Sequence, residues 1–182
     1  MLNVLKMLKS TFVLLIQYKN IMKRIIFSLS AFCLGCLAFS QTHTSSVINK
    51  NPKSLFDPTP FAFSHATSHD GEGQYVFISG QSGGEGLKHS LSADFRTQVK
   101  WSLKNLETVL SEYGLGVNDV LKITILIVDH DQEKLKIWTE EMHKTWKNHT
   151  FPASTLIPVP KLALDHMQIE VDAVAFSKKK IH

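Results

Sequence analysis

The chain has 182 residues, of which 43% are hydrophobic and 20% are charged, so it can bury the core of one domain. Its formal net charge is +4, but five of its 20 basic residues and none of its 16 acidic residues lie in 1–40. The remaining 15 basic and 16 acidic residues give 41–182 a net charge of −1. Without a basic surplus or a basic stripe, we expect no nucleic-acid partner.

Residues 1–40 predict a leader that contains an export signal. A short positive region at 22–24 precedes an apolar stretch at 25–39, which is shorter than the ~18–20 apolar residues of a membrane-spanning helix. Small residues at the end of this stretch predict cleavage before Gln41, and Met22 is the expected start of translation. We therefore expect a periplasmic or secreted protein that keeps no stable membrane partner after cleavage.

The two cysteines, Cys33 and Cys36, both lie inside this apolar stretch. Their C-x-x-C spacing has no strand-to-helix context, so we interpret them as apolar residues rather than as a redox pair. An uncleaved membrane anchor and lipidation of Cys36 are the less favoured alternatives for the leader. After cleavage the chain would contain no cysteine, which excludes disulfide bonds and a thiol nucleophile.

After the leader, residues 41–60 are polar with three prolines and predict a linker or arm. The aromatic runs 61–67 and 75–80 have the length of strands, and the Asp-Gly pair at 70–71 predicts a hairpin between them. The segment 81–86 predicts a flexible glycine-rich loop. It lacks the G-x-x-x-x-G-K-[ST] spacing of a phosphate-binding loop.

A long helix follows, with Ser92 as its expected N-cap, an end near Tyr113 and Gly114 as its terminator. Its apolar residues recur at steps of three and four, which predicts one packed face. The β-branched run 121–129 predicts a strand that is covered on at least one side. The remaining predicted elements are a helix at 131–148, with an apolar stripe through Leu135 and Trp138, and strands at 154–160 and 168–176.

The predicted order β-β-α-β-α-β-β corresponds to a single α+β domain with both helices on one face of a mixed sheet. In the last strand, alternation places Ile169, Val171 and Ala173 on one face and Glu170 and Asp172 on the other. The basic tail at 178–182 is expected to be a solvated end.

Residue spacing identifies no metal site and no nucleophile elbow. The nine histidines are scattered, without H-E-x-x-H or paired Cys/His spacing. His143 and His149 lie six residues apart across a predicted helix end, and we do not expect them to converge. Ser79 has no G-x-S-x-G context and no base near it in the sequence. We therefore expect no bound metal, and spacing alone predicts only a small exported α+β domain.

Five blocks, in this order, resemble the RidA/YjgF family: FSHAT (63–67), FISGQ (77–81), residues 98–129, FPAST (151–155) and QIEVDAVA (168–175). The resemblance implies a RidA-like domain at 61–177 with a chorismate-mutase-like fold. It also implies a homotrimer with a ligand cleft between neighbouring subunits. The implied activity is hydrolysis of reactive enamines and imines to 2-keto acids and ammonia, with no cofactor.

Such hydrolysis needs a positioned water and a proton acceptor, because an imine carbon is already electrophilic. A substrate carboxylate also needs a cationic clamp, which arginine supplies with its planar fork. The resemblance implies an arginine directly after Pro152 and Ala153, where this chain has Ser154. We expect the serine to weaken deamination of 2-imino acids and to favour a ligand that lacks a carboxylate.

The other site positions also follow from the resemblance. Glu170 corresponds to the glutamate that helps to position the attacking water, and it is the expected catalytic residue. The expected substrate-binding residues are Phe63, Ser79, Gly80, Ser154 and Thr155. Phe63 stands where tyrosine is common, His65 where glutamine is usual, and Leu156 where cysteine is common. Purely structural roles remain open for these positions, such as a strand-end turn at 79–80 or a solvated strand residue at 170.

Two functions therefore remain open. The first is an imine or enamine hydrolase of altered substrate range, and the alternative is a non-catalytic trimer that binds a small metabolite. A trimer is expected on physical grounds as well, because residues 121–128 are apolar on both faces and two helices on one side cover only one of them.

Overall fold

The computed structural model describes Lys19 and residues 47–178. The chain divides into two units, Met1–Thr44 and Ser45–His182, and in the first unit only Lys19 is described. The predicted export signal, the cleavage before Gln41, both cysteines and most of the basic tail lie outside the described residues. Within the described part, no helix is long and apolar enough to cross a membrane.

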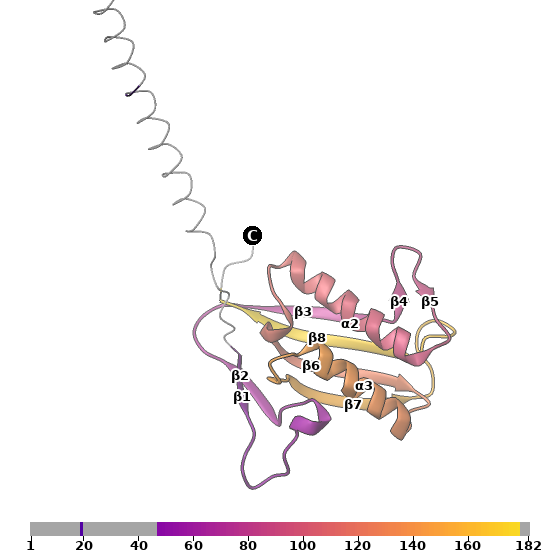
Figure 1. The fold of residues 1–182 in the computed structure, drawn as a ribbon, viewed down its shortest axis with the longest axis horizontal. Helices are drawn as coiled ribbons and strands as arrows, with labels where there is room; N and C mark the ends of the chain where they lie inside the picture. Colours follow the sequence, from indigo (N-terminus) through magenta and orange to yellow (C-terminus); the bar gives the residue numbers. More distant parts are fainter. Residues whose placement is uncertain (1–18, 20–46, 179–182) are drawn as a thin grey trace, which may run out of the picture. The chain divides into compact units, whose positions relative to one another are not determined.

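A four-stranded mixed sheet forms the centre of the second unit, with the strand order β3-β8-β6-β7 (Figure 1). The strands are β3 (Gln74–Ser82), β6 (Val120–Val128), β7 (Ala153–Val159) and β8 (Ile169–Ser177). Strand β8 is antiparallel to both β3 and β6, while β6 and β7 are parallel. Parallel neighbours need a crossover connection, and helix α3 (Gln132–Thr145) supplies it. The predicted mixed sheet is confirmed, with β3 and β7 as its edge strands.

Helix α2 (Phe95–Glu112) and helix α3 lie on the same face of the sheet, as predicted (Figure 1). Asp94, rather than Ser92, caps α2, since its carboxylate accepts a hydrogen bond from the Thr97 amide at 2.7 Å. Gly114 follows α2 with a φ of 65°, a left-handed conformation that glycine adopts without strain. The short 3-10 helix η2 (Val117–Asp119) then leads into β6.

The core lies between the two helices and the sheet. Along β8, Ile169, Val171 and Ala173 are buried, whereas Glu170 and Asp172 point to the opposite, open face of the sheet. This outcome confirms the predicted alternation. The same period places Ile123, Ile125 and Ile127 of β6 in the core.

An ion-pair group ties α2 to α3. Arg96 of α2 donates to Glu140 at 2.8 Å and to Glu141 at 2.6 Å, and Lys144 donates to Glu141 at 2.7 Å. The Glu141 side chain is only 5% exposed. Burial by itself raises the pKa of the Glu141 carboxyl, but the hydrogen bonds from Lys144 and Arg96 outweigh burial and hold this pKa below its usual value.

The first part of the second unit differs from the sequence prediction. Strand β1 (Val47–Lys50) lies inside the segment expected to be a linker, and it pairs antiparallel with β2 (Ala66–His69). Strand β3 pairs with β8 instead of β2, so the hairpin predicted around Asp70-Gly71 is wrong. The run 61–67 is not one strand, because Thr59–Phe61 form a 3-10 helix (η1) and Ala62 turns the chain with a φ of 58°.

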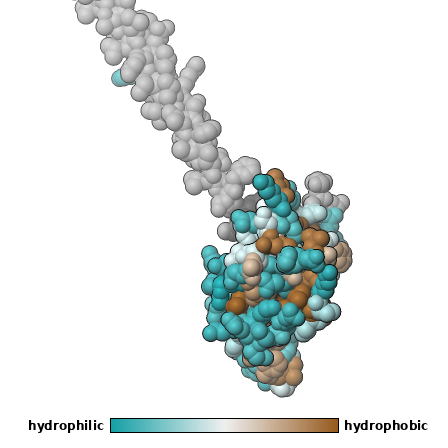
Figure 2. Space-filling view, turned by 90° about the vertical axis from the view of Figure 1, so that its right-hand side faces the viewer, coloured by the Kyte–Doolittle hydropathy of each residue, from teal (hydrophilic) through white to brown (hydrophobic). Residues whose placement is uncertain are grey.

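The glycine-rich segment 81–86 contains the end of β3 and a short further strand, where the sequence predicts a loop. Strand β4 (Gly84–Glu85) pairs with β5 (Ser90–Leu91), and Asn105 of α2 donates to the carbonyls of Ser82 and Gly84 at 3.0 and 2.9 Å. Gly83 lies so close to Gln98 that any side chain there would overlap it. Figure 2 views the unit from this end, where hydrophilic surface predominates and hydrophobic residues gather in separate patches.

Candidate functional site

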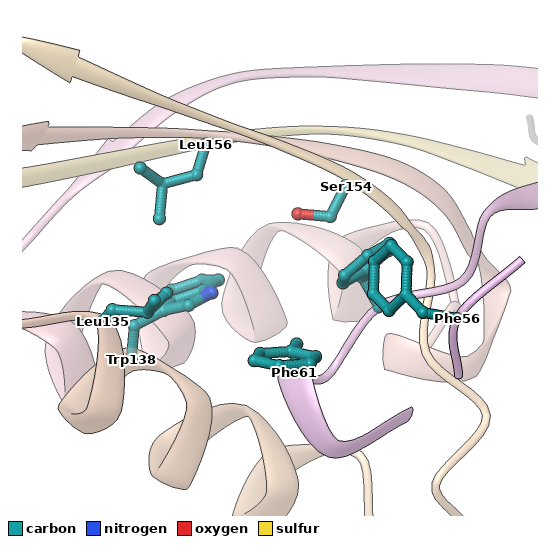
Figure 3. Close-up of a pocket in the computed structure, with 7 residues that line it drawn as sticks. Phe56, Phe61, Leu135, Trp138, Ser154 and Leu156 are labelled. Carbon is teal, nitrogen blue, oxygen red and sulfur yellow. The ribbon is translucent and has the colours of Figure 1, made fainter. Parts of the chain in front are cut away.

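A pocket of about 360 Å³ lies at the β7 edge of the sheet (Figure 3). Strand β7, helix α3 and the segment before β2 enclose it. Six apolar side chains and one hydroxyl line the pocket: Phe56, Phe61, Phe63, Leu135, Trp138, Ser154 and Leu156. None of these side chains carries a charge, so the pocket suits an apolar, uncharged ligand.

The blocks FSHAT and FPAST, which are far apart in the sequence, lie side by side at this pocket. Ser64 forms a parallel bridge with Ala153, and its amide donates to the Pro152 carbonyl at 2.9 Å. The Ser64 hydroxyl donates to the Phe151 carbonyl at 2.7 Å, and Asn49 of β1 donates both to that carbonyl and to the Ser64 hydroxyl. These bonds fix the aromatic segment around Ser64 against the start of β7.

Alternation along β7 sorts the predicted site residues between two faces. Ser154 and Leu156 pair with buried residues of β6 and enter the pocket, where the Ser154 hydroxyl is directed inward (Figure 3). Thr155 points to the open face, is exposed, and accepts a hydrogen bond from Lys122. Burial lowers the pKa of the Lys122 ammonium, and the nearby Asp172 carboxylate acts in the opposite direction. Thr155 therefore lies outside the pocket.

Ser79, Gly80 and Glu170 meet near the opposite edge of the sheet. The register between β3 and β8 shifts between Ile78 and Gln81, so Ser79 and Gly80 form a bulge. The Glu170 side chain covers Gly80, and a methyl group added at residue 80 would overlap the carboxylate. Glycine at this position is therefore what permits Glu170 to approach the bulge.

These two groups of residues do not meet within one chain. The pocket opens on the helix-covered face of β7, whereas Glu170 points to the open face of β8, two strands away. Neighbouring strands lie about 4.8 Å apart, so about 10 Å of sheet separates the two positions. Within one chain, the pocket residues and Glu170 therefore do not line a common cavity.

His143 and His149 do converge, so the sequence prediction was wrong. Their Nδ1 atoms are 3.2 Å apart, because α3 ends at Thr145 and His149 turns the chain back with a φ of 55°. Both rings contact Phe151 edge-on. Zinc sites use at least three protein ligands, and the described residues include no cluster of three or more His, Cys, Asp or Glu that could hold a metal.

Sequence reasoning missed four of the pocket residues. Phe56 and Phe61 lie in or beside the predicted linker, while Leu135 and Trp138 were assigned only to the core stripe of a helix. The available signal was the density of phenylalanine in FDPTPFAF (56–63), where prolines disfavour a regular strand that would place the aromatic rings on the face of a sheet.

The sequence is similar to those of known proteins. The sequence pattern described as Endoribonuclease L-PSP matches residues 58–177. A 2-iminobutanoate/2-iminopropanoate deaminase from Salmonella typhimurium is 31% identical over 103 residues, which is 57% of this chain and 80% of that protein. The chain belongs to the RidA/YjgF family. A RutC family protein from Pyrococcus abyssi is 29% identical over 112 residues, covering 58% of this chain and 81% of that protein.

Solved structures agree with the RidA/YjgF assignment. A Rid family protein of unknown function from Yersinia pestis has a TM-score of 0.69 and 26% identity, covering 72% of this chain and 99% of that chain. RidA from the Antarctic bacterium Psychrobacter sp. has a TM-score of 0.53 and 20% identity, with 74% and 100% covered, which shows likeness of fold alone. The α+β fold implied by the resemblance is confirmed.

Proposed function

We propose that the protein hydrolyses a small imine or enamine to a carbonyl compound and ammonia, at a cleft between copies of the chain. The observation that carries this proposal is the pocket at the FPAST joint, into which Ser154 points. Membership of the RidA/YjgF family, with a 2-imino acid deaminase among its relatives, supports the reaction class. No cofactor is required, because water adds to a carbon that is already electrophilic.

Ser154 sets the expected substrate range. The resemblance implies an arginine at this position, and the substrates in the relative's name, 2-iminobutanoate and 2-iminopropanoate, are carboxylates. Losing one partner of a buried charge pair costs ~2–5 kcal/mol. A serine hydroxyl returns only ~1 kcal/mol through one neutral hydrogen bond. The net loss is about 1–4 kcal/mol, so deamination of 2-imino acids should be about 5-fold or more slower than in an arginine-bearing relative.

A homotrimer would bring Glu170 of one chain to the pocket of a neighbouring chain. The open face of the sheet exposes Tyr75, Phe77 and Ile157, whose side chains are 52%, 79% and 41% exposed. Soluble proteins rarely leave large apolar patches exposed, and assembly around a three-fold axis would bury these residues. Their exposure in the single chain therefore supports a trimer. Light scattering should give a mass near three chains, and a clean monomer at micromolar concentration would contradict the trimer.

The second candidate is a trimer that binds a small metabolite without turning it over. The observation that favours it is the placement of Glu170 outside the pocket of its own chain. RNA cleavage, which the family description suggests, receives no support from the pocket, since none of its lining residues is a cation that could hold a phosphate.

Export through the leader at 1–40 remains part of the proposal. N-terminal sequencing of protein recovered outside the cytoplasm should begin at Gln41. If the mature protein instead begins at a lipidated Cys36, it is anchored in a membrane and not secreted in free form.

The reaction is tested by ammonia release from imines that an amino-acid oxidase generates in situ. The wild-type chain should deaminate 2-iminopropanoate poorly, and Ser154→Arg should raise this rate about 5-fold or more. A wild-type rate equal to that of an arginine-bearing relative would refute the assigned effect of Ser154. Absence of hydrolysis for every imine, with or without a carboxylate, would leave the binding trimer as the function.

A further inference from the structure

The pocket has a chemical character that points to one class of ligand. Four aromatic and two aliphatic side chains line it, and its side-chain polar groups are the Ser154 hydroxyl and the indole N–H of Trp138, neither of which is charged. A carboxylate in this space would lose its hydration and find no cation among the lining residues, which is costly. Its volume of about 360 Å³ lies at the small end of the range for ligand pockets.

The aromatic side chains form an edge-to-face cluster that is open on one side. The ring of Phe56 lies 6.0 Å from that of Phe61 at 81° and 5.9 Å from that of Phe63 at 65°. Phe56 and Phe61 are 60% and 51% exposed, so each has a ring surface that the chain itself leaves uncovered. The indole of Trp138 lies across the pocket from this cluster (Figure 3). A ligand ring inserted between them would bury these surfaces and extend the edge-to-face pattern.

His65 holds this aromatic wall in place. Its Nε2 lies 2.9 Å from the Phe56 carbonyl, and because a carbonyl only accepts, this nitrogen donates. Its backbone amide donates to the Asn51 side chain at 2.9 Å, and its ring contacts Phe56 and Phe63 edge-on. His65 is therefore a positioning residue for the wall, and it does not replace the missing arginine as a clamp for a carboxylate.

We infer that the pocket binds an uncharged carbonyl or imine compound with an aromatic or branched apolar body, and that the segment 56–63 determines this specificity. The chemical step rests on the proposed function, whereas the class of ligand is inferred from the lining of the pocket alone. In that step the water oxygen bonds to the imine carbon, both water protons pass to nitrogen, and the carbon–nitrogen bond breaks to release ammonia. Neither an oxidant nor a reductant is needed.

The test uses calorimetric titration of the full chain with two ketones that differ in one group. Phenylacetone carries a methyl group where phenylpyruvate carries a carboxylate, so the pair isolates the effect of the charge. Phenylacetone should bind at least tenfold more tightly than phenylpyruvate, and pyruvate should not bind measurably. Phe61→Ala should weaken phenylacetone binding several-fold, whereas the control Leu87→Ala, at an exposed apolar residue between β4 and β5, should not change it.

Ser154→Arg should reverse the preference toward phenylpyruvate. Equal or tighter binding of phenylpyruvate by the wild-type chain, or no binding of phenylacetone, would overturn the inferred ligand class. An unchanged affinity in Phe61→Ala would overturn the role of the segment 56–63. Tight phenylacetone binding without hydrolysis of any imine would support the inference and refute the proposed hydrolase, so the two failures are distinguishable.

Discussion

At the β7 edge of the sheet, seven uncharged side chains enclose a pocket, whereas near the β3 edge a backbone bulge holds the carboxylate of Glu170 against Gly80. The first region can recognise an apolar body but holds no proton acceptor. The second offers a carboxylate but no enclosure. Under the proposed function, ligand binding and proton transfer would use opposite faces of one sheet, and assembly of several chains would bring them together.

Glu170→Gln should have the largest effect on the reaction. A general base contributes about 10²- to 10⁴-fold to rate, so imine hydrolysis should fall by that factor. Phenylacetone affinity should change much less than the rate, because the pocket lining stays intact and a ketone offers the carboxylate no N–H or O–H to bind. Rate and affinity are measured by ammonia release and calorimetry. The matched control Asp172→Asn, on the same face of β8, should keep the rate. A parallel loss of rate and affinity in Glu170→Gln would argue against separate roles for the two edges.

Mixing two inactive variants tests whether the site is shared between chains. Ser154→Trp fills the pocket but keeps Glu170, and Glu170→Gln keeps the pocket. The two chains are refolded together in equal amounts, so half of the pockets and half of the Glu170 carboxylates are intact. If each pocket works with the Glu170 of a neighbour, an intact pocket meets an intact carboxylate in about a quarter of the sites. About a quarter of the wild-type activity should then return. Mixtures that stay as inactive as their parents would place the whole reaction within one chain.

Glu141→Gln tests how far the two regions depend on each other for stability. Its carboxylate joins α2, which covers β3 and β8, to α3, which lines the pocket. Its removal should lower the free energy of unfolding by about 1–3 kcal/mol at pH 7. Because the folded pKa of Glu141 is lowered, the stabilisation is complete above the usual value of 4.5 and is lost as the pH falls through the folded value.

Urea unfolding at pH 7 and at pH 3 would therefore show a smaller difference between wild type and Glu141→Gln at the lower pH. Glu140→Gln is the matched control, because its exposed pair with Arg96 is worth at most about 1 kcal/mol. Equal losses for both variants would contradict a special role for the buried carboxylate.

The smallest expected effect is that of Gly80→Ala. The added methyl group would push the Glu170 side chain away from the bulge, which should lower hydrolysis about tenfold through misplacement of the base. Phenylacetone affinity should stay at the wild-type value in calorimetry. Gly116→Ala is the control for the loss of chain flexibility, because this glycine has open space around it and a φ of −131° that alanine can adopt. Full activity in Gly80→Ala would show that the approach of Glu170 to the bulge is unimportant.

The helices and the long strands were predictable because each has a clear period: β6 and β8 alternate, and α2 repeats at three and four residues. The partner of β2 was not predictable, because the Asp70-Gly71 signal is local, whereas the pairing of β1 with β2 depends on the distant contacts of Asn49. The resemblance pointed to Ser154 and Phe63, and the pocket contains both. Phe56 and Phe61 were missed because no periodic pattern assigns a face to residues in a proline-bounded turn.

The bond from Asn49 to Phe151 joins residues that are 102 positions apart in the sequence. Closing so large a loop carries an entropic cost that local contacts do not repay, so we expect the segment 47–65 to dock after β7 has joined the sheet. The pocket wall should therefore be the last part of the unit to fold and the first to open. Side-chain hydrogen bonds and one parallel bridge between Ser64 and Ala153 hold this wall, and none of them pairs the four sheet strands with one another. The wall can therefore detach while the four-stranded sheet stays intact. Ligand entry then requires no unfolding of the core, and a bound ring would slow hydrogen exchange of the amides in this segment.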